Sequence, residues 1–103
     1  MTGPDTLSIE QRGICAVLSG ELDILSGPRM AVSLLRLANR AQRLELDLSG
    51  VTFMDACGLR ALLWLKRALP TLRIVAVSPR VERVLMMTET YVLLADVQLE
   101  HAS

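Results

Sequence analysis

A chain of 103 residues, 51% of them hydrophobic, is predicted to form one small domain that buries its core without metal or disulfide support. Its 11 basic and 11 acidic side chains cancel, and it contains one Phe, one Tyr and one Trp. The sequence therefore lacks both the charged field that recruits nucleic acid and the aromatic rings that stack bases, and we expect no nucleic acid partner.

The two cysteines, Cys15 and Cys57, lie far apart and outside any Cys-x-x-Cys pair. This spacing predicts two free thiols in a reducing cytoplasm. Cys15 stands in a run of apolar residues and is expected in the core. The sequence begins without a signal-peptide pattern and has no apolar run of roughly 18 residues or more, so we expect a cytoplasmic protein without direct membrane insertion.

The first half of the chain reads as two strands and a helix. Residues 7–9 predict a short edge strand, residues 11–13 a turn, and the apolar run 14–18 a strand that is covered on both faces and ended by Gly20. Ser26-Gly27-Pro28 predicts a helix start, because Ser can cap and Pro is tolerated in the first turn.

The second half repeats strand and helix. Residues 44–48 alternate between leucine and acidic residues, as in a strand with one buried face, and a helix is predicted over 56–68. Another strand over 72–77 precedes a helix that opens at Ser78-Pro79, and residues 91–94 predict a last strand. We therefore expect one α/β domain over residues 1–103, with its core at about 6–97, a short unassigned tail and a mainly parallel sheet of four or five strands.

The middle of the chain carries a specific motif. Leu46-Asp47-Leu48-Ser49 leads through Phe53-Met54 into Asp55-Ala56-Cys57-Gly58 and a leucine-rich helix, and Gly20-Glu21-Leu22-Asp23 stands upstream. These segments resemble the STAS domain family, in the form found in bacterial anti-sigma factor antagonists. The resemblance covers nearly the whole chain and implies a single STAS domain.

The resemblance also shows that Cys57 stands where related proteins carry a phosphorylated serine. In the phosphorylated members the second serine of Asp-Ser-Ser-Gly accepts phosphate from the anti-sigma factor, and here that position is Cys57. A thiol is no substrate for serine phosphorylation, so the sequence predicts either a permanently active antagonist or a thiol-based redox regulator. The plainer interpretation is that Cys57 is a small residue that fits the turn. Ser49 and Thr52 are alternative phosphoacceptors, or simply turn hydroxyls.

The residues at the start of the second helix explain why a phosphorylation switch can be placed at this turn. If Asp55 caps the second helix, its carboxylate accepts a hydrogen bond from the first helical turn, where Cys57 and Gly58 lie. The same helix end carries partial positive charge and tolerates an added phosphate. A phosphate there would oppose the docking of a partner by its charge.

By analogy with the family, the partner surface forms where the loops after the strands converge. Trp64 between Arg60 and Arg67 has the composition of an interface anchor, although the ring can equally lie flat over its neighbours. The residues predicted to contact a partner are Asp23, Ser26, Asp55, Ala56, Cys57, Gly58, Arg60 and Trp64.

We therefore expect a non-enzymatic regulator that binds a kinase-like ATPase, the anti-sigma factor, and releases a sigma factor. An accessory subunit of a membrane lipid-transport ATPase is the alternative from another class, and homodimer formation is left open. A thiol enzyme built on Cys57 has no candidate base. Asp23 and Asp55 lack a third ligand, since His101 lies in the tail, so neither a metal nor a cofactor is expected.

Overall fold

The computed structural model describes residues 7–41 and 43–88, and strands and helices alternate along them after an initial strand pair. The helix predicted over 56–68 is confirmed at both ends. The elements are β1 (Leu7–Arg12), β2 (Cys15–Leu22), α1 (Ser26–Ala41), β3 (Glu45–Met54), α2 (Ala56–Ala68), β4 (Arg73–Val77) and α3 (Pro79–Met87).

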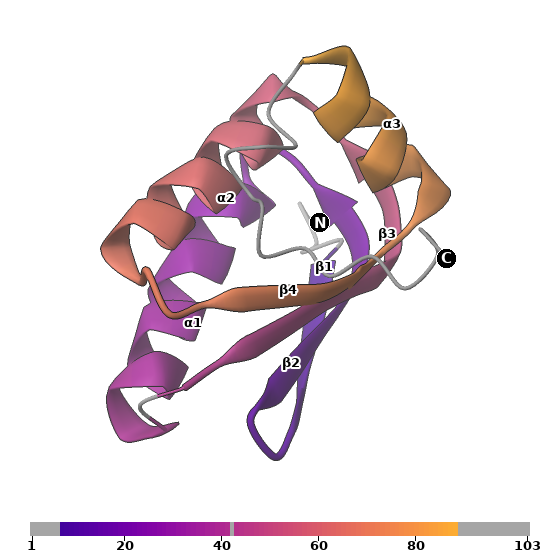
Figure 1. Ribbon diagram of the computed structural model, residues 1–103. Helices are drawn as coiled ribbons and strands as arrows, with labels where there is room; N and C mark the ends of the chain where they lie inside the picture. Colours follow the sequence, from indigo (N-terminus) through magenta and orange to yellow (C-terminus); the bar gives the residue numbers. More distant parts are fainter. Residues whose placement is uncertain (1–6, 42, 89–103) are drawn as a thin grey trace, which may run out of the picture.

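The described strands form one four-stranded sheet in the order β1-β2-β3-β4. β1 pairs antiparallel with β2, whereas β2–β3 and β3–β4 are parallel. The prediction of an α/β fold with a mainly parallel sheet is therefore confirmed. All three helices lie on one side of the sheet (Figure 1).

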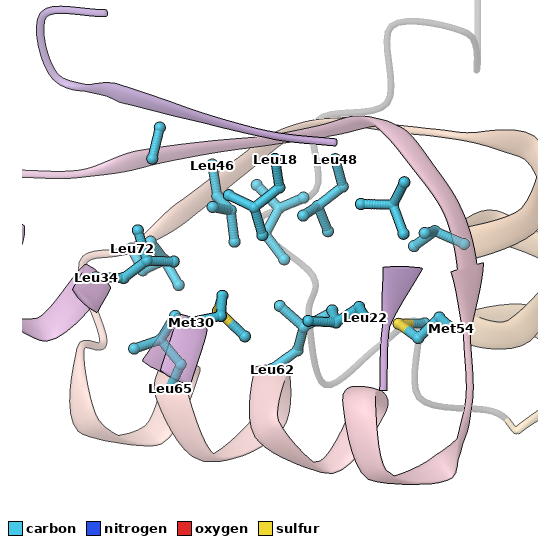
Figure 2. Close-up of a cluster of buried hydrophobic side chains, with 14 of the residues drawn as sticks. Leu18, Leu22, Met30, Leu34, Leu46, Leu48, Met54, Leu62, Leu65 and Leu72 are labelled. Atoms are coloured by element: carbon cyan, nitrogen blue, oxygen red, sulfur yellow. The ribbon is translucent and has the colours of Figure 1, made fainter. Parts of the chain in front are cut away.

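The core lies between this side of the sheet and the helices. Leu18, Leu46 and Leu48 point from the strands toward Leu34 of α1 and Leu62 of α2 (Figure 2), and all five side chains are fully buried. Alternation along each strand makes this possible, because successive side chains point to opposite faces. The helix-facing side chains therefore carry most of the apolar burial.

The other sheet face corrects the prediction that β2 is covered on both sides. Cys15 and Val17 are only half-buried, whereas Ala16 and Leu18 are fully buried. The apolar run in the sequence hides this difference, because it has no polar residue to mark the outer face. Cys15 is therefore not a core residue.

The first two strands end later than predicted, and a glycine lies near each of the predicted ends. β1 continues to Arg12, and the turn lies at Gly13, whose φ of 62° favours glycine. Gly20 does not end β2; it lies inside the strand with a φ of 113°, next to a shift of register against β3. A glycine in a strand often marks such a bulge.

β3 is longer than the alternation of its leucines predicts. Ser49 and Gly50 lie within the strand rather than in a turn, and β3 runs on to Met54. Gly50 pairs with Ser19 of β2, next to a second shift in the register of β2 against β3. A Cβ at Gly50 would lie 2.6 Å from the Ser19 hydroxyl oxygen. The Ser-Gly pair thus permits a close approach of two strands.

The predicted strand over 91–94 and the tail lie outside the described residues. The start predicted for α3 is confirmed, since the Ser78 hydroxyl accepts a hydrogen bond of 3.2 Å from the Val81 N–H. Pro79 follows as the first helical residue, where its missing N–H is not needed.

Candidate functional site

The site begins at the loop between β2 and α1, which Asp23 organises. One carboxylate oxygen of Asp23 accepts hydrogen bonds of 3.0 Å from the backbone N–H groups of Leu25 and Ser26. These bonds, chiefly the one from Ser26, lower the pKa of Asp23 below its ordinary value. The ionised carboxylate therefore holds the loop, and Ile24 and Leu25 project outward with 64% and 69% of their surface exposed.

Ser26 lies beneath this loop rather than on its surface. Its side chain is 2% exposed, and its hydroxyl donates a hydrogen bond of 2.7 Å to the Glu21 carbonyl while accepting one of 2.9 Å from the Asp23 N–H. Ser26 is thus the first residue of α1 and ties its start to the end of β2. We assign it a supporting role, because a buried hydroxyl offers no surface to a partner.

The second loop, between β3 and α2, is organised by Asp55. Asp55 is the N-cap of α2, and its carboxylate accepts a hydrogen bond of 2.8 Å from the Gly58 N–H. Its own backbone N–H donates a bond of 3.4 Å to the Leu22 carbonyl at the end of β2. The predicted cap is confirmed, and it joins the start of α2 to the neighbouring strand.

Replacing Asp55 with alanine should lower the free energy of unfolding by about 1 kcal/mol, since the Gly58 N–H loses its cap. Asp55→Asn keeps an acceptor oxygen at the same position and should retain most of the stability. Urea denaturation of the three proteins measures the difference. Equal losses in both variants would show that the charge of Asp55, and not its hydrogen bond, stabilises α2.

Gly58 brings the two loops together. A Cβ at Gly58 would lie 2.8 Å from the carbonyl carbon of Leu22 and would overlap the attached oxygen. Only a residue without a side chain therefore lets the first turn of α2 rest on the end of β2. Gly58 is itself buried, so its contribution to the site is this close approach.

A groove of about 520 Å³ lies beside this junction, between α1 and α2. Cys57, half-buried in the first turn of α2, forms part of its wall. Almost all the other lining side chains are apolar. The groove is lined by Ile24, Pro28, Ala31, Val32, Cys57, Arg60, Ala61 and Trp64.

The family model for the STAS domain matches residues 7–98. The chain belongs to this family. A solved structure of an anti-sigma factor antagonist from Mycobacterium paratuberculosis is similar, with a TM-score of 0.66 and 24% identity over 96% of this chain and 89% of that one. The unphosphorylated anti-sigma factor antagonist SpoIIAA is similar with a TM-score of 0.65 and 18% identity, over 90% of this chain and 86% of that one. No curated protein sequence matches.

Several residues predicted from the STAS motif meet at the groove. Cys57, Arg60 and Trp64 share its α2 wall, and Trp64 keeps 52% of its surface exposed. Ala56 is exposed in the same first turn. The structure therefore places the signature turn, a basic side chain and an aromatic ring on one surface of this STAS domain.

Sequence reasoning missed the α1 wall of the groove. Val32 of α1 and Ile24 of the preceding loop lie on this side of the groove, with 49% and 64% of their surfaces exposed. A signal was present: Val32 falls outside the apolar stripe of α1, and Ile24-Leu25 is an apolar pair in a loop. An apolar residue on the outer face of an amphipathic helix is a candidate contact.

The two alternative phosphoacceptors, Ser49 and Thr52, lie on β3 and not in the first turn of α2. Ser49 is exposed, and its hydroxyl donates a hydrogen bond of 2.6 Å to the Asp47 carboxylate. Thr52 is also exposed and donates one of 3.3 Å to the Gly20 carbonyl. Neither side chain is among those that line the groove.

The remaining features bear on other kinds of chemistry. Burial, followed by the charges of Asp47 and Glu45, raises the pKa of the Cys15 thiol, so this cysteine is a poor nucleophile at neutral pH. Among residues 7–41 and 43–88, no three His, Cys, Asp or Glu side chains are grouped to hold a metal ion. In the same part of the chain, no helix has the length and apolar character needed to cross a membrane.

Proposed function

We propose that this STAS domain is an anti-sigma factor antagonist that binds a kinase-like anti-sigma factor and so releases a sigma factor. The observation that carries the proposal is the capped first turn of α2, which presents Cys57 beside an apolar groove and the exposed Trp64. Two proteins of similar fold are anti-sigma factor antagonists, which supports this role. The protein acts by binding and performs no catalysis of its own.

The surface around the groove has the features of a protein interface. Trp64 supplies a large, half-exposed ring, and the neighbouring groove offers an apolar recess. Aromatic side chains beside such recesses are typical interface anchors. Both the β2–α1 loop and the first turn of α2 are held by carboxylate caps, so little ordering is needed on binding.

The release of a sigma factor provides the direct test. The purified protein is added to a complex of a sigma factor with a kinase-like anti-sigma factor from the same organism, and free sigma factor is followed by size-exclusion chromatography. We expect a complex of antagonist with anti-sigma factor to replace the original one. Binding to a lipid-transport ATPase, with no exchange in any sigma factor complex, would contradict the proposal.

This antagonist lacks the serine at position 57 through which related proteins are switched off by phosphorylation. A serine hydroxyl at position 57 would accept phosphate next to the α2 N-terminus, where a phosphate meets favourable electrostatics. The thiol of Cys57 does not take part in serine phosphorylation, so the antagonist stays competent to bind. Its activity is then set by its amount in the cell.

The variant Cys57→Ser should gain a phosphate at residue 57 when it is incubated with the kinase-like anti-sigma factor and ATP. Phosphorylation adds about −1.5 to −2 charges, and we expect it to weaken the complex. Mass spectrometry of wild type, Cys57→Ser and the control Cys57→Ala locates the phosphate. A phosphate on Ser49 or Thr52 of the wild type would show instead that regulation has moved to β3.

A further inference from the structure

The charges of this domain are distributed unevenly although they cancel overall. The sequences of α1 and α2 together contain no Asp or Glu. They contain six basic residues, three in each helix: Arg29, Arg36, Arg40, Arg60, Lys66 and Arg67. The two helices that form the groove are therefore a basic element within a neutral protein.

The basic side chains stand next to the apolar groove. Arg60 lines the groove on α2, and helical spacing places Trp64 and Arg67 on the same stripe of that helix. A second hollow of about 360 Å³ shares Pro28 and Val32 with the groove and adds Arg29 of α1. Arg60 therefore lies in the groove wall itself, and Arg29 lies in an adjoining hollow.

Two carboxylates lie at the end of this surface where the helices begin. Asp23 and Asp55 stand at the starts of α1 and α2, where they accept hydrogen bonds from backbone N–H groups. The positive ends of the helices offset part of their charge. An acidic group on a partner is therefore favoured toward Arg60 and Arg67, further along α2.

We propose that the groove between α1 and α2 receives an apolar side chain of the anti-sigma factor, and that a carboxylate beside this side chain pairs with Arg60. This inference rests on the proposed function and specifies the chemistry of the partner surface. Charge complementarity selects this occupant, because a basic surface around an apolar recess is matched by an acidic surface around an apolar anchor. Arg is well suited to such pairs, since its planar guanidinium binds a carboxylate through two hydrogen bonds.

Trp64 makes occupation of the groove directly observable. It is the single tryptophan of the chain, so labelling with 5-fluorotryptophan gives one fluorine resonance in the groove wall. The anti-sigma factor found by the sigma-release assay, unlabelled, is titrated into the labelled protein. We expect the resonance to shift as the complex forms, and we expect the affinity to fall as salt is raised, because salt screens the charges.

Two variants separate the charge from the apolar recess. Arg60→Glu reverses an exposed charge, and Val32→Asp places a carboxylate in the α1 wall. Each should weaken binding by about tenfold or more. The matched control is Arg83→Glu on α3, an exposed residue that does not line the groove, and it should bind like the wild type. Circular dichroism confirms that each variant is folded.

The outcomes distinguish this inference from the proposed function. Release of the sigma factor without a fluorine shift, and with equal affinities for Arg60→Glu and Arg83→Glu, would overturn the groove assignment and leave the function intact. Failure of the wild type to bind any anti-sigma factor would overturn both. A shift that appears only with vesicles of phosphatidylglycerol and phosphatidylcholine, or only on self-association at high concentration, would assign the groove to a membrane or to a second copy instead.

Discussion

Replacing Gly58 with alanine is expected to cause a large loss of stability, because the site has no room for a methyl group. The new Cβ would overlap the carbonyl oxygen of Leu22 and lie 2.8 Å from its carbon. These are backbone atoms at the end of β2, so no side chain can rotate away to make room. Overpacking of a close-packed site commonly costs about 1–3 kcal/mol, and we expect the upper end of this range or more.

The same methyl group at Gly13 is the matched control. A Cβ at Gly13 meets no atom within 4 Å, but the φ of 62° is unfavourable for alanine. The expected cost is about 1 kcal/mol. Urea denaturation of both variants measures the difference, and a loss for Gly58→Ala no larger than that for Gly13→Ala would show that α2 moves away from β2 without difficulty.

Displacement of α2 in Gly58→Ala should also affect binding. The first turn of α2 carries Cys57, and the contact of Gly58 with Leu22 fixes its position relative to the β2–α1 loop. A shift of this turn would separate the two walls of the groove. The variant is therefore expected to bind the anti-sigma factor more weakly even under conditions in which it is fully folded.

Replacing Trp64 with alanine is expected to have the largest effect on partner affinity. The ring lines the groove and keeps 52% of its surface exposed. Truncation of a central aromatic anchor commonly costs about 2 kcal/mol or more, which corresponds to roughly a thirtyfold loss of affinity. Because half of the ring is already in solvent, the free energy of unfolding should change far less than in Gly58→Ala.

Met87→Ala is a suitable comparison for Trp64→Ala. Met87 is a large apolar side chain on α3 with 76% of its surface exposed, and it does not line the groove. Isothermal titration calorimetry with the anti-sigma factor should show wild-type affinity for this variant. If Trp64→Ala binds as tightly as Met87→Ala, the ring only covers its neighbours and is no anchor.

The two loops at the site could be predicted to different degrees. The cap at Asp55 follows from the sequence, because an acidic residue before a helical leucine pattern satisfies the first backbone N–H groups locally. The buried position of Ser26 does not follow, since its hydroxyl bonds to Glu21 and Asp23 only once the chain has turned between β2 and α1. A serine at a helix start has the same local pattern whether it is exposed or buried.

In the strands, too, some features could be predicted from the sequence and others depend on the neighbouring strand. Leu46 and Leu48 indicate one buried face of β3 through their alternation with acidic residues. The bulges at Gly20 and Gly50 are set by the pairing of β2 with β3. In the sequence alone, Ser49-Gly50 has the composition of a turn, and only the neighbouring strand makes it part of a longer β3.

The sequence by itself determined the family, the alternation of strands and helices, and the position of Cys57 in the first turn of α2. These features depend on residues that are close together in the chain, so hydrophobic periodicity and helix-capping residues are enough to predict them. The tertiary structure decided the groove, because its walls come from α1 and α2, which pack against each other at Gly27, while Gly58 rests on Leu22 at the end of β2. It also brought Arg60 of α2 into the same groove wall as Val32 of α1, since packing, rather than sequence spacing, brings residues of two helices together.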